Sequence, residues 1–226
     1  MKKHVMMMGL ALLLSGLALQ AQSPFGIDSQ AKQKKVSFSL GVTAGANMSG
    51  LLGVSTSDPS LGIKPGFSGG AVFQLRFIPR NNRSGAETGW MAIQPEVRFS
   101  MQGGKSGQTG LNLTYLSIPV MVQFYPTKGL YLEVGPVANI NLGHSPNSLQ
   151  LGDKQYELTG LKAHDVMLGV GLGYLFDFGL GLGVRYNHGI MALNKSLPMR
   201  NYCIQAGVSY LFRVGKTSHR AASIDF

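Results

Sequence analysis

The sequence predicts an all-β protein, an eight-stranded antiparallel up-and-down transmembrane β-barrel. Eight stretches of the 226-residue chain alternate apolar residues with small or polar ones. This period of two is the signature of a β-strand, because successive side chains point to opposite faces. Charged residues make up only 13% of the chain and glycine occurs 31 times, whereas an ordinary soluble domain has roughly a quarter charged residues. An export signal precedes the first strand, which favours an outer-membrane location.

Residues 1–21 form the predicted signal peptide for Sec-type export. Lys2 and Lys3 provide the positive start, an apolar stretch follows over residues 5–19, and Ala21 is the small residue at the cleavage site. The apolar stretch is too short for a membrane anchor. No cysteine follows the cleavage site directly, which disfavours a lipoprotein. The remaining chain is expected to comprise an N-terminal periplasmic segment (22–35), an outer-membrane β-barrel (36–214) and a basic C-terminal tail (215–226).

The formal net charge of +10 includes the two lysines of the signal peptide. Nucleic-acid binding would require a clustered basic stripe with interleaved aromatic residues, and the sequence has none. We therefore expect no nucleic-acid partner. The excess positive charge is expected at the barrel rim, where it meets anionic outer-membrane lipid.

The first four predicted strands each present an apolar face to lipid and a small or polar face to the lumen. The outward residues are Phe38, Leu40 and Val42 in residues 36–48; Phe67, Phe73 and Leu75 in 65–77; Met91, Ile93, Val97 and Phe99 in 90–102; and Leu116, Ile118, Val120 and Val122 in 111–125.

The last four strands repeat this alternation. Their outward residues are Leu132, Val134 and Ile140 in residues 130–142; Val166, Leu168, Val170 and Leu172 in 166–176; Leu180, Leu182, Val184 and Tyr186 in 180–187; and Tyr202, Ile204, Val208 and Tyr210 in 202–212. Pro95, Pro119 and Pro136 lie inside strands, where each removes a ladder donor, so irregular pairing is expected beside them.

Two regularities support closure across a membrane. Connections after strands four and six are short, whereas outer loops are expected near residues 49–63, 103–110, 143–162 and 192–199; the connection after strand two departs from this pattern. Aromatic residues also gather at the short-turn end as an expected lipid-interface girdle. Its members are Phe38, Phe77, Phe124, Tyr174, Phe176, Tyr210 and Phe212. A soluble sandwich or lipocalin-like barrel would instead carry a charged outward face.

Five short motifs lie along the predicted strands: GVTAGANMS at residues 41–49, QPEVR at 94–98, YLSIPV at 115–120, GP at 135–136 and RYNHG at 185–189. Together they resemble the PorT-like outer-membrane β-barrel family of Bacteroidetes. The similarity covers nearly the whole mature chain; Ser117, often acidic in the family, and the tail beyond Phe212 depart from it. The resemblance implies an eight-stranded outer-membrane barrel. The family's namesake is associated with type IX protein secretion, so the resemblance also implies a link to that process.

Five charged residues fall on the lumen face by parity: Arg76, Glu96, Arg98, Glu133 and Arg185. An eight-stranded barrel is just wide enough for side chains to fill, and buried charges must be paired. We therefore predict a structural lumen charge network. The alternatives are an ion or proton path, or a site for a small polar ligand.

No catalytic, cofactor-binding or metal-binding residues are predicted. A lipid-modifying enzyme is the alternative, with His164, Asp165 and Ser145 as candidates beside His144 and His188, but no nucleophile motif is present. Gly104-Lys105-Ser106 lacks the earlier glycine of a phosphate loop. Glycines alternating over 169–173 and 179–183 are expected to make room for Arg185 and Tyr131, and Cys203 to be a buried filler.

The expected function is a non-enzymatic structural or interaction role in the cell envelope. Partners are expected to be envelope or secretion-system proteins that contact the loops, and the barrel itself is expected to be monomeric. No cofactor is expected.

Overall fold

The computed structural model describes residues 35–53, 60–78, 89–106, 109–146, 148–151, 154–157, 162–193 and 199–213. The predicted signal peptide, most of the periplasmic segment and the basic tail lie outside these residues. The strands of the described part are β1 (Lys35–Gly53), β2 (Leu61–Ile78), β3 (Met91–Ser106), β4 (Thr109–Phe124), β5 (Leu130–Ser145), β6 (Ser148–Leu151), β7 (Lys154–Glu157), β8 (His164–Leu175), β9 (Leu180–Gly189) and β10 (Met199–Arg213).

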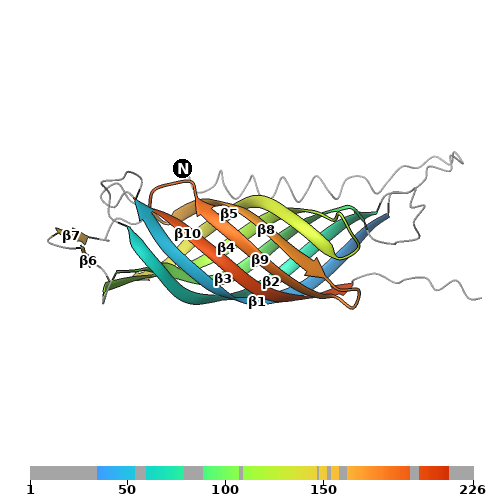
Figure 1. Ribbon diagram of the computed structural model, residues 1–226, viewed down its shortest axis with the longest axis horizontal. Helices are drawn as coiled ribbons and strands as arrows, with labels where there is room; N and C mark the ends of the chain where they lie inside the picture. The colour runs from blue at the N-terminus through green and yellow to red at the C-terminus, as the bar shows by residue number, and fades with distance from the viewer. Residues whose placement is uncertain are drawn as a thin grey trace, which may run out of the picture. The chain divides into compact units, whose positions relative to one another are not determined.

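Eight of these strands close into a barrel in the order β1-β10-β9-β8-β5-β4-β3-β2 (Figure 1). All neighbouring pairs are antiparallel. The first and last strands close the ring along a register that runs from Ser39–Arg213 to Gly53–Met199. Closure removes the free strand edges that an open sheet would expose. The predicted eight-stranded antiparallel barrel is confirmed.

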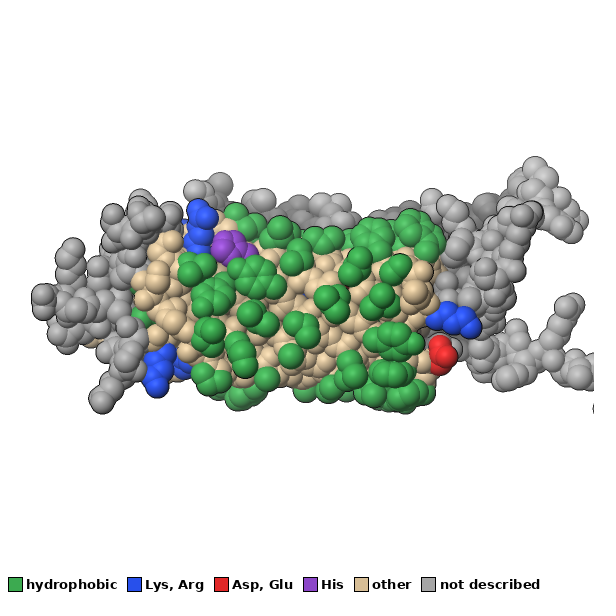
Figure 2. All heavy atoms as spheres, viewed as in Figure 1, with side chains coloured by type: hydrophobic (Ala, Val, Ile, Leu, Met, Phe, Trp, Pro, Cys, Tyr) green, Lys and Arg blue, Asp and Glu red, His purple; other side chains and the backbone are tan. Residues whose placement is uncertain are grey.

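The outer surface of the barrel is apolar between its two ends. Alternate residues of each strand point outward, and Val42, Phe67 and Leu132 each expose more than half of their surface. On the face seen in Figure 2, hydrophobic side chains cover the body of the barrel and charged side chains lie towards its ends. The shortest barrel strand, β9, has 10 residues, which at about 3.4 Å per residue and a tilt of about 40° rises about 25 Å, the height of the lipid-facing band of such barrels.

The connections differ from the predicted loops in one important place. The prediction of a loop at residues 103–110 is wrong, because β3 continues to Ser106, β4 begins at Thr109, and these two residues pair. Gly103, which has a φ of 138°, allows the backbone to continue in this conformation. The other outer connections span residues 54–60, 146–163 and 190–198, where loops were expected at 49–63, 143–162 and 192–199. The second of them contains the small β6–β7 hairpin.

The in-strand prolines interrupt the ladders beside them, as expected. The β3–β4 pairing passes from Pro95–Val120 directly to Arg98–Ser117, and the β4–β5 pairing passes from Pro119–Val137 to Val122–Val134. A proline cannot donate a ladder hydrogen bond, so each gap costs pairing without changing the register.

No helix among the described residues is long and apolar enough to cross a membrane.

Candidate functional site

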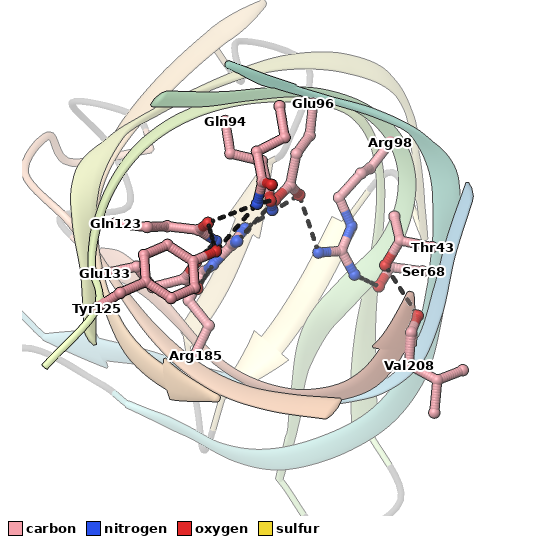
Figure 3. Close-up of polar contacts among 11 residues, drawn as sticks. Thr43, Ser68, Gln94, Glu96, Arg98, Gln123, Tyr125, Glu133, Arg185 and Val208 are labelled. Carbon is pink, nitrogen blue, oxygen red and sulfur yellow. Dashed lines mark hydrogen bonds and ion pairs between the residues drawn. The ribbon is translucent and has the colours of Figure 1, made fainter. Parts of the chain in front are cut away.

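The lumen is the most highly organised polar region of the described barrel. Three consecutive inward positions of β3 hold Gln94, Glu96 and Arg98, all less than a tenth exposed. Glu133 on β5 and Arg185 on β9 face them across the interior (Figure 3). The strand period of two places all of these side chains on the same side of the wall.

We call Glu96, Arg98, Glu133 and Arg185 the lumen ion network. The Arg185 guanidinium donates from Nη1 and Nη2 to the two oxygens of Glu96 at 3.1 and 2.7 Å. Its Nε donates to Glu133 at 2.7 Å. Arg98 donates to Glu96 at 3.2 Å and to the Ser68 hydroxyl at 2.6 Å. Because β9 and β3 are opposite each other in the ring, the Arg185–Glu96 pair spans the lumen.

The network contains two carboxylates and two guanidinium groups, so it is electrically neutral. Each carboxylate contacts more than one donor, since Gln94 also donates to Glu96 and Gln123 to Glu133, both at 3.0 Å. Burying a charge without a partner costs several kcal/mol. The bidentate geometry of Arg185 and the amide donors around both carboxylates meet that cost, and they hold the two walls of the barrel together.

A layer of amide and phenol groups lies on the short-turn side of the network. Gln74 donates from its amide nitrogen to Gln94, Gln123 and the Tyr125 hydroxyl at 3.0–3.1 Å. The Tyr125 hydroxyl in turn donates to Gln123 at 2.8 Å. Burial raises the pKa of Tyr125, in the turn after β4, to about 12, so the phenol stays neutral and keeps its proton for this hydrogen bond.

Arg76 was predicted to belong to the charge network, and the structure places it at the short-turn end instead. Its guanidinium lies 3.7 Å from the centre of the Tyr125 ring. It also donates to the carbonyl oxygens of Gly89 at 3.1 Å and Lys128 at 3.5 Å. Arg76 therefore joins the polar interior through Tyr125. The other four residues predicted for the charge network, those of the lumen ion network, do contact one another.

The opposite end of the lumen is closed by apolar side chains, which we call the apolar cap. All are buried, and Leu193 reaches the cap from the segment after β9. The members are Leu51, Leu61, Leu111, Leu113, Tyr115, Leu193 and Met199. Parity predicted that Leu111, Leu113 and Tyr115 would face inward. Leu51, Leu61 and Leu193 belong to predicted loops, so the sequence pattern did not assign them to the core.

A small cavity adjoins the network on its glycine-rich side. It has a volume of about 40 Å³ and its lining includes Arg98, Tyr131 and Gln205. Since one water needs roughly 10–15 Å³ on this measure, the cavity has room for a few waters. It is too small for a typical ligand pocket, which holds about 300–1,000 Å³.

The glycines beside this cavity leave room for the Tyr131 side chain, as the sequence predicts. A Cβ atom at Gly173 would overlap the Tyr131 ring, and one at Gly183 would lie 2.8 Å from the Tyr131 hydroxyl oxygen. At Gly171 a Cβ atom would meet the Val184 carbonyl oxygen at 2.7 Å and the Glu133 carboxylate at 2.8 Å, rather than Arg185. Cys203 is buried and makes no disulfide.

The candidate hydrolase residues are not assembled into a catalytic triad. His164 points outward and Asp165 points inward, since they are consecutive residues of β8. His188 lies on the outer surface, where its Nδ1 is 3.0 Å from the Tyr186 hydroxyl. Ser145 is exposed at the end of β5. Within the described residues, no three His, Cys, Asp or Glu side chains form a metal-binding group.

The aromatic residues predicted for the lipid interface lie on the outward face near the short-turn end. Tyr174 and Phe176 contact edge to face at 4.9 Å between ring centres, as do Tyr210 and Phe212. Trp90, missed from the sequence, extends this girdle, with its ring centre 6.4 Å from that of Phe124. Phe178 also belongs to it through Phe176. Phe178 lies in a connection, where strand parity gives no direction. Trp90 opens the predicted strand at 90–102, where parity places it on the lumen face, but β3 begins only at Met91 and Trp90 is exposed.

Residues 20–195 match the family described as the outer membrane protein beta-barrel domain. The chain belongs to this family. Membership of this family, together with the apolar outer surface of the barrel, indicates an outer-membrane protein of the cell envelope. Comparison with curated proteins gives no match.

Several solved structures of bacterial surface barrels are similar to this chain, at low sequence identity. The attachment invasion locus protein Ail of Yersinia pestis is 11% identical, with 77% of this chain and 98% of that chain covered and a TM-score of 0.46. Neisserial surface protein A is 20% identical, with 76% and 97% covered and a TM-score of 0.44. The translocator domain of the autotransporter NalP from Neisseria meningitidis is 13% identical, with 92% and 96% covered and a TM-score of 0.26.

Proposed function

We propose that this protein is a closed, monomeric and non-enzymatic outer-membrane barrel that holds its outer loops in place for contacts with other envelope proteins. The observation that carries the proposal is the Arg185–Glu96 pair, which spans the lumen with bonds of 2.7 and 3.1 Å. A network that ties opposite walls together suits a rigid support better than a channel. The apolar cap closes the lumen a second time.

The finer proposal is that the protein is a PorT-like barrel of Bacteroidetes that acts in type IX protein secretion after Sec-type export. It is supported by the motifs at residues 41–49, 94–98 and 185–189. Two of these motifs contribute Glu96, Arg98 and Arg185, so the resemblance includes the residues that close the lumen.

Site-specific photo-cross-linking in native membranes tests the interaction role. A photoreactive amino acid at position 150 or 155, in the β6–β7 hairpin, should give cross-links to envelope proteins. The matched position Val208, which is 49% exposed on the lipid-facing wall, should give none. Equal labelling from both positions, or none from the hairpin and other outer connections, would contradict the proposed role.

Two cellular measurements test the finer proposal and the absence of enzymatic activity. Deletion of the protein should impair export of type IX cargo, and normal cargo export would remove the secretion role. The lipid A profile should be the same for the native protein and for His164→Ala and Ser145→Ala variants. An altered profile would favour the lipid-modifying enzyme instead.

A further inference from the structure

Asp165 is a buried carboxylate without a partner in the outer half of the lumen. Its residue is only 3% exposed, and neither side-chain oxygen has a side-chain hydrogen-bond or ion-pair partner among the described residues, the backbone of the next residue, Val166, being the one donor that acts on it. Buried carboxylates are normally paired or hydrogen-bonded, because the cost of leaving one bare is several kcal/mol. Asp165 therefore lacks a group that the described residues do not supply.

Polar oxygen-bearing side chains surround Asp165 on the inward faces of β4 and β5. Asn139 is its direct cross-strand neighbour, and Ser117 pairs with Asn139 and donates to its Oδ1 at 2.6 Å. Tyr115 is close enough for the Asp165 carboxylate to act on its hydroxyl electrostatically. The Tyr115 hydroxyl and the Asn139 Nδ2 also have no partner. We call these four residues the Asp165 cluster.

Among the described residues, the arginines of the lumen ion network are engaged elsewhere. Arg98 and Arg185 bind Glu96 and Glu133, and buried Val137 and Met167, the next inward pair below Asn139 and Asp165, lie between the cluster and that network. The Lys162 ammonium is the positive charge that acts on Asp165, and its Nζ donates to the Ala192 carbonyl at 2.8 Å.

Two further cations lie at the ends of the lumen. Lys64 is on β2, the strand opposite β8 in the ring, and Arg76 is at the short-turn end over Tyr125. Neither forms an ion pair with Asp165 among the described residues. The ion network is neutral by itself, so among the described residues the Asp165 cluster has one negative charge that no ion pair compensates.

We infer that the Asp165 cluster binds a monovalent cation of the Na⁺ type. A water molecule that joins Asn139 to Asp165 would satisfy hydrogen bonds but leave the charge. A divalent ion would replace one excess negative charge with one excess positive charge. The available ligands are carboxylate, amide and hydroxyl oxygens, which suit a hard cation. The ion would lie between the apolar cap and the ion network and would stabilise the closed outer half of the lumen.

Thermal unfolding of the refolded barrel in detergent tests the site. The unfolding temperature should rise by a few degrees when NaCl replaces choline chloride at equal ionic strength, because a ligand that binds only the folded state stabilises it. Asp165→Asn should abolish this Na⁺-specific rise. Asp177→Asn, which changes an exposed aspartate in the β8–β9 turn, should retain it.

The ²³Na NMR signal of the native barrel gives a second readout that does not depend on a variant. It should broaden on addition of barrel and sharpen again when the barrel is unfolded. An unfolding temperature that responds to pH but not to cation identity would overturn the inference, because it would show that a proton neutralises Asp165. A Na⁺-specific rise that persists in Asp165→Asn would overturn it as well. So would a ²³Na signal that is not broadened by the barrel.

Discussion

At the scale of single residues, Glu96 is the centre of the lumen ion network. It contacts both Arg98 and Arg185, while Glu133 contacts Arg185 alone among the arginines. Loss of the Glu96 charge would leave two guanidinium groups with one carboxylate in a buried region. The two glutamates are therefore expected to differ in their contribution to stability, although both face the lumen.

Glu96→Gln should lower the free energy of unfolding by about 3–5 kcal/mol, the usual cost of removing one partner from a buried ion pair. Glu133→Gln should lower it less, because Arg185 keeps both bonds to Glu96. Urea unfolding in lipid vesicles measures both values. Equal costs for the two glutamates would contradict the central role of Glu96.

Glycine is required at lumen positions where a large side chain passes close to the wall. Gly173→Ala should reduce the free energy of unfolding by about 1–3 kcal/mol, because the added methyl group would overlap the Tyr131 ring. Gly143→Ala is the matched control, since a Cβ atom there meets nothing within 4 Å. Chemical denaturation should separate the two variants, and Tyr131→Ala should reduce the cost of Gly173→Ala. Similar values for both glycines would exclude the packing explanation.

At the scale of elements, strand parity predicted which residues face the lumen but not which of them meet. Glu96 and Arg185 are 89 positions apart, and their contact depends on the register of every intervening strand pair. Local composition also failed at residues 103–110, where glycine, serine and lysine suggest a loop. There contacts with the neighbouring strands decide the structure, because β3 and β4 pair from Gly103–Asn112 to Ser106–Thr109 and Gly104 lies against Leu61 of β2.

The segment after β9 is the second element that tertiary contacts define. Leu193 accepts a hydrogen bond from the Lys162 amide at 3.1 Å and donates one to the Met199 carbonyl at 2.9 Å. These bonds hold its side chain, only 4% exposed, in the apolar cap. A sequence pattern of alternating residues gives no signal for such a contact, because the segment is not a strand.

Leu193→Ala should destabilise the barrel by about 2–5 kcal/mol, the range for truncation of a buried leucine. Met191→Ala, two residues away and 43% exposed, should change stability by less than about 0.5 kcal/mol. Hydrogen exchange of the Leu193 amide should also become faster in Leu193→Ala. Unchanged exchange and stability would show that the outer mouth is closed without this side chain.

At the scale of the whole molecule, we expect the girdle at the short-turn end to set the depth of the barrel in the membrane. Aromatic rings favour the lipid–water interface, and the rings of Tyr174, Phe176 and Phe178 form a continuous contact series there. Trp90, which is 54% exposed, lies just before β3, and its ring centre is 6.4 Å from that of Phe124 at the end of β4. The chain has one tryptophan, so its fluorescence reports the position of this girdle.

Trp90 fluorescence should be quenched more strongly by lipids brominated near the headgroup than by lipids brominated near the chain end, because Trp90 lies at the interface rather than in the hydrocarbon core. The variant Trp90→Phe with Val97→Trp moves the indole seven residues along the chain into β3, to an outward position 43% exposed. It should show the opposite order of quenching, since that position is near the middle of the apolar band. The same order in both proteins would mean that the barrel does not cross the bilayer with this girdle at one interface.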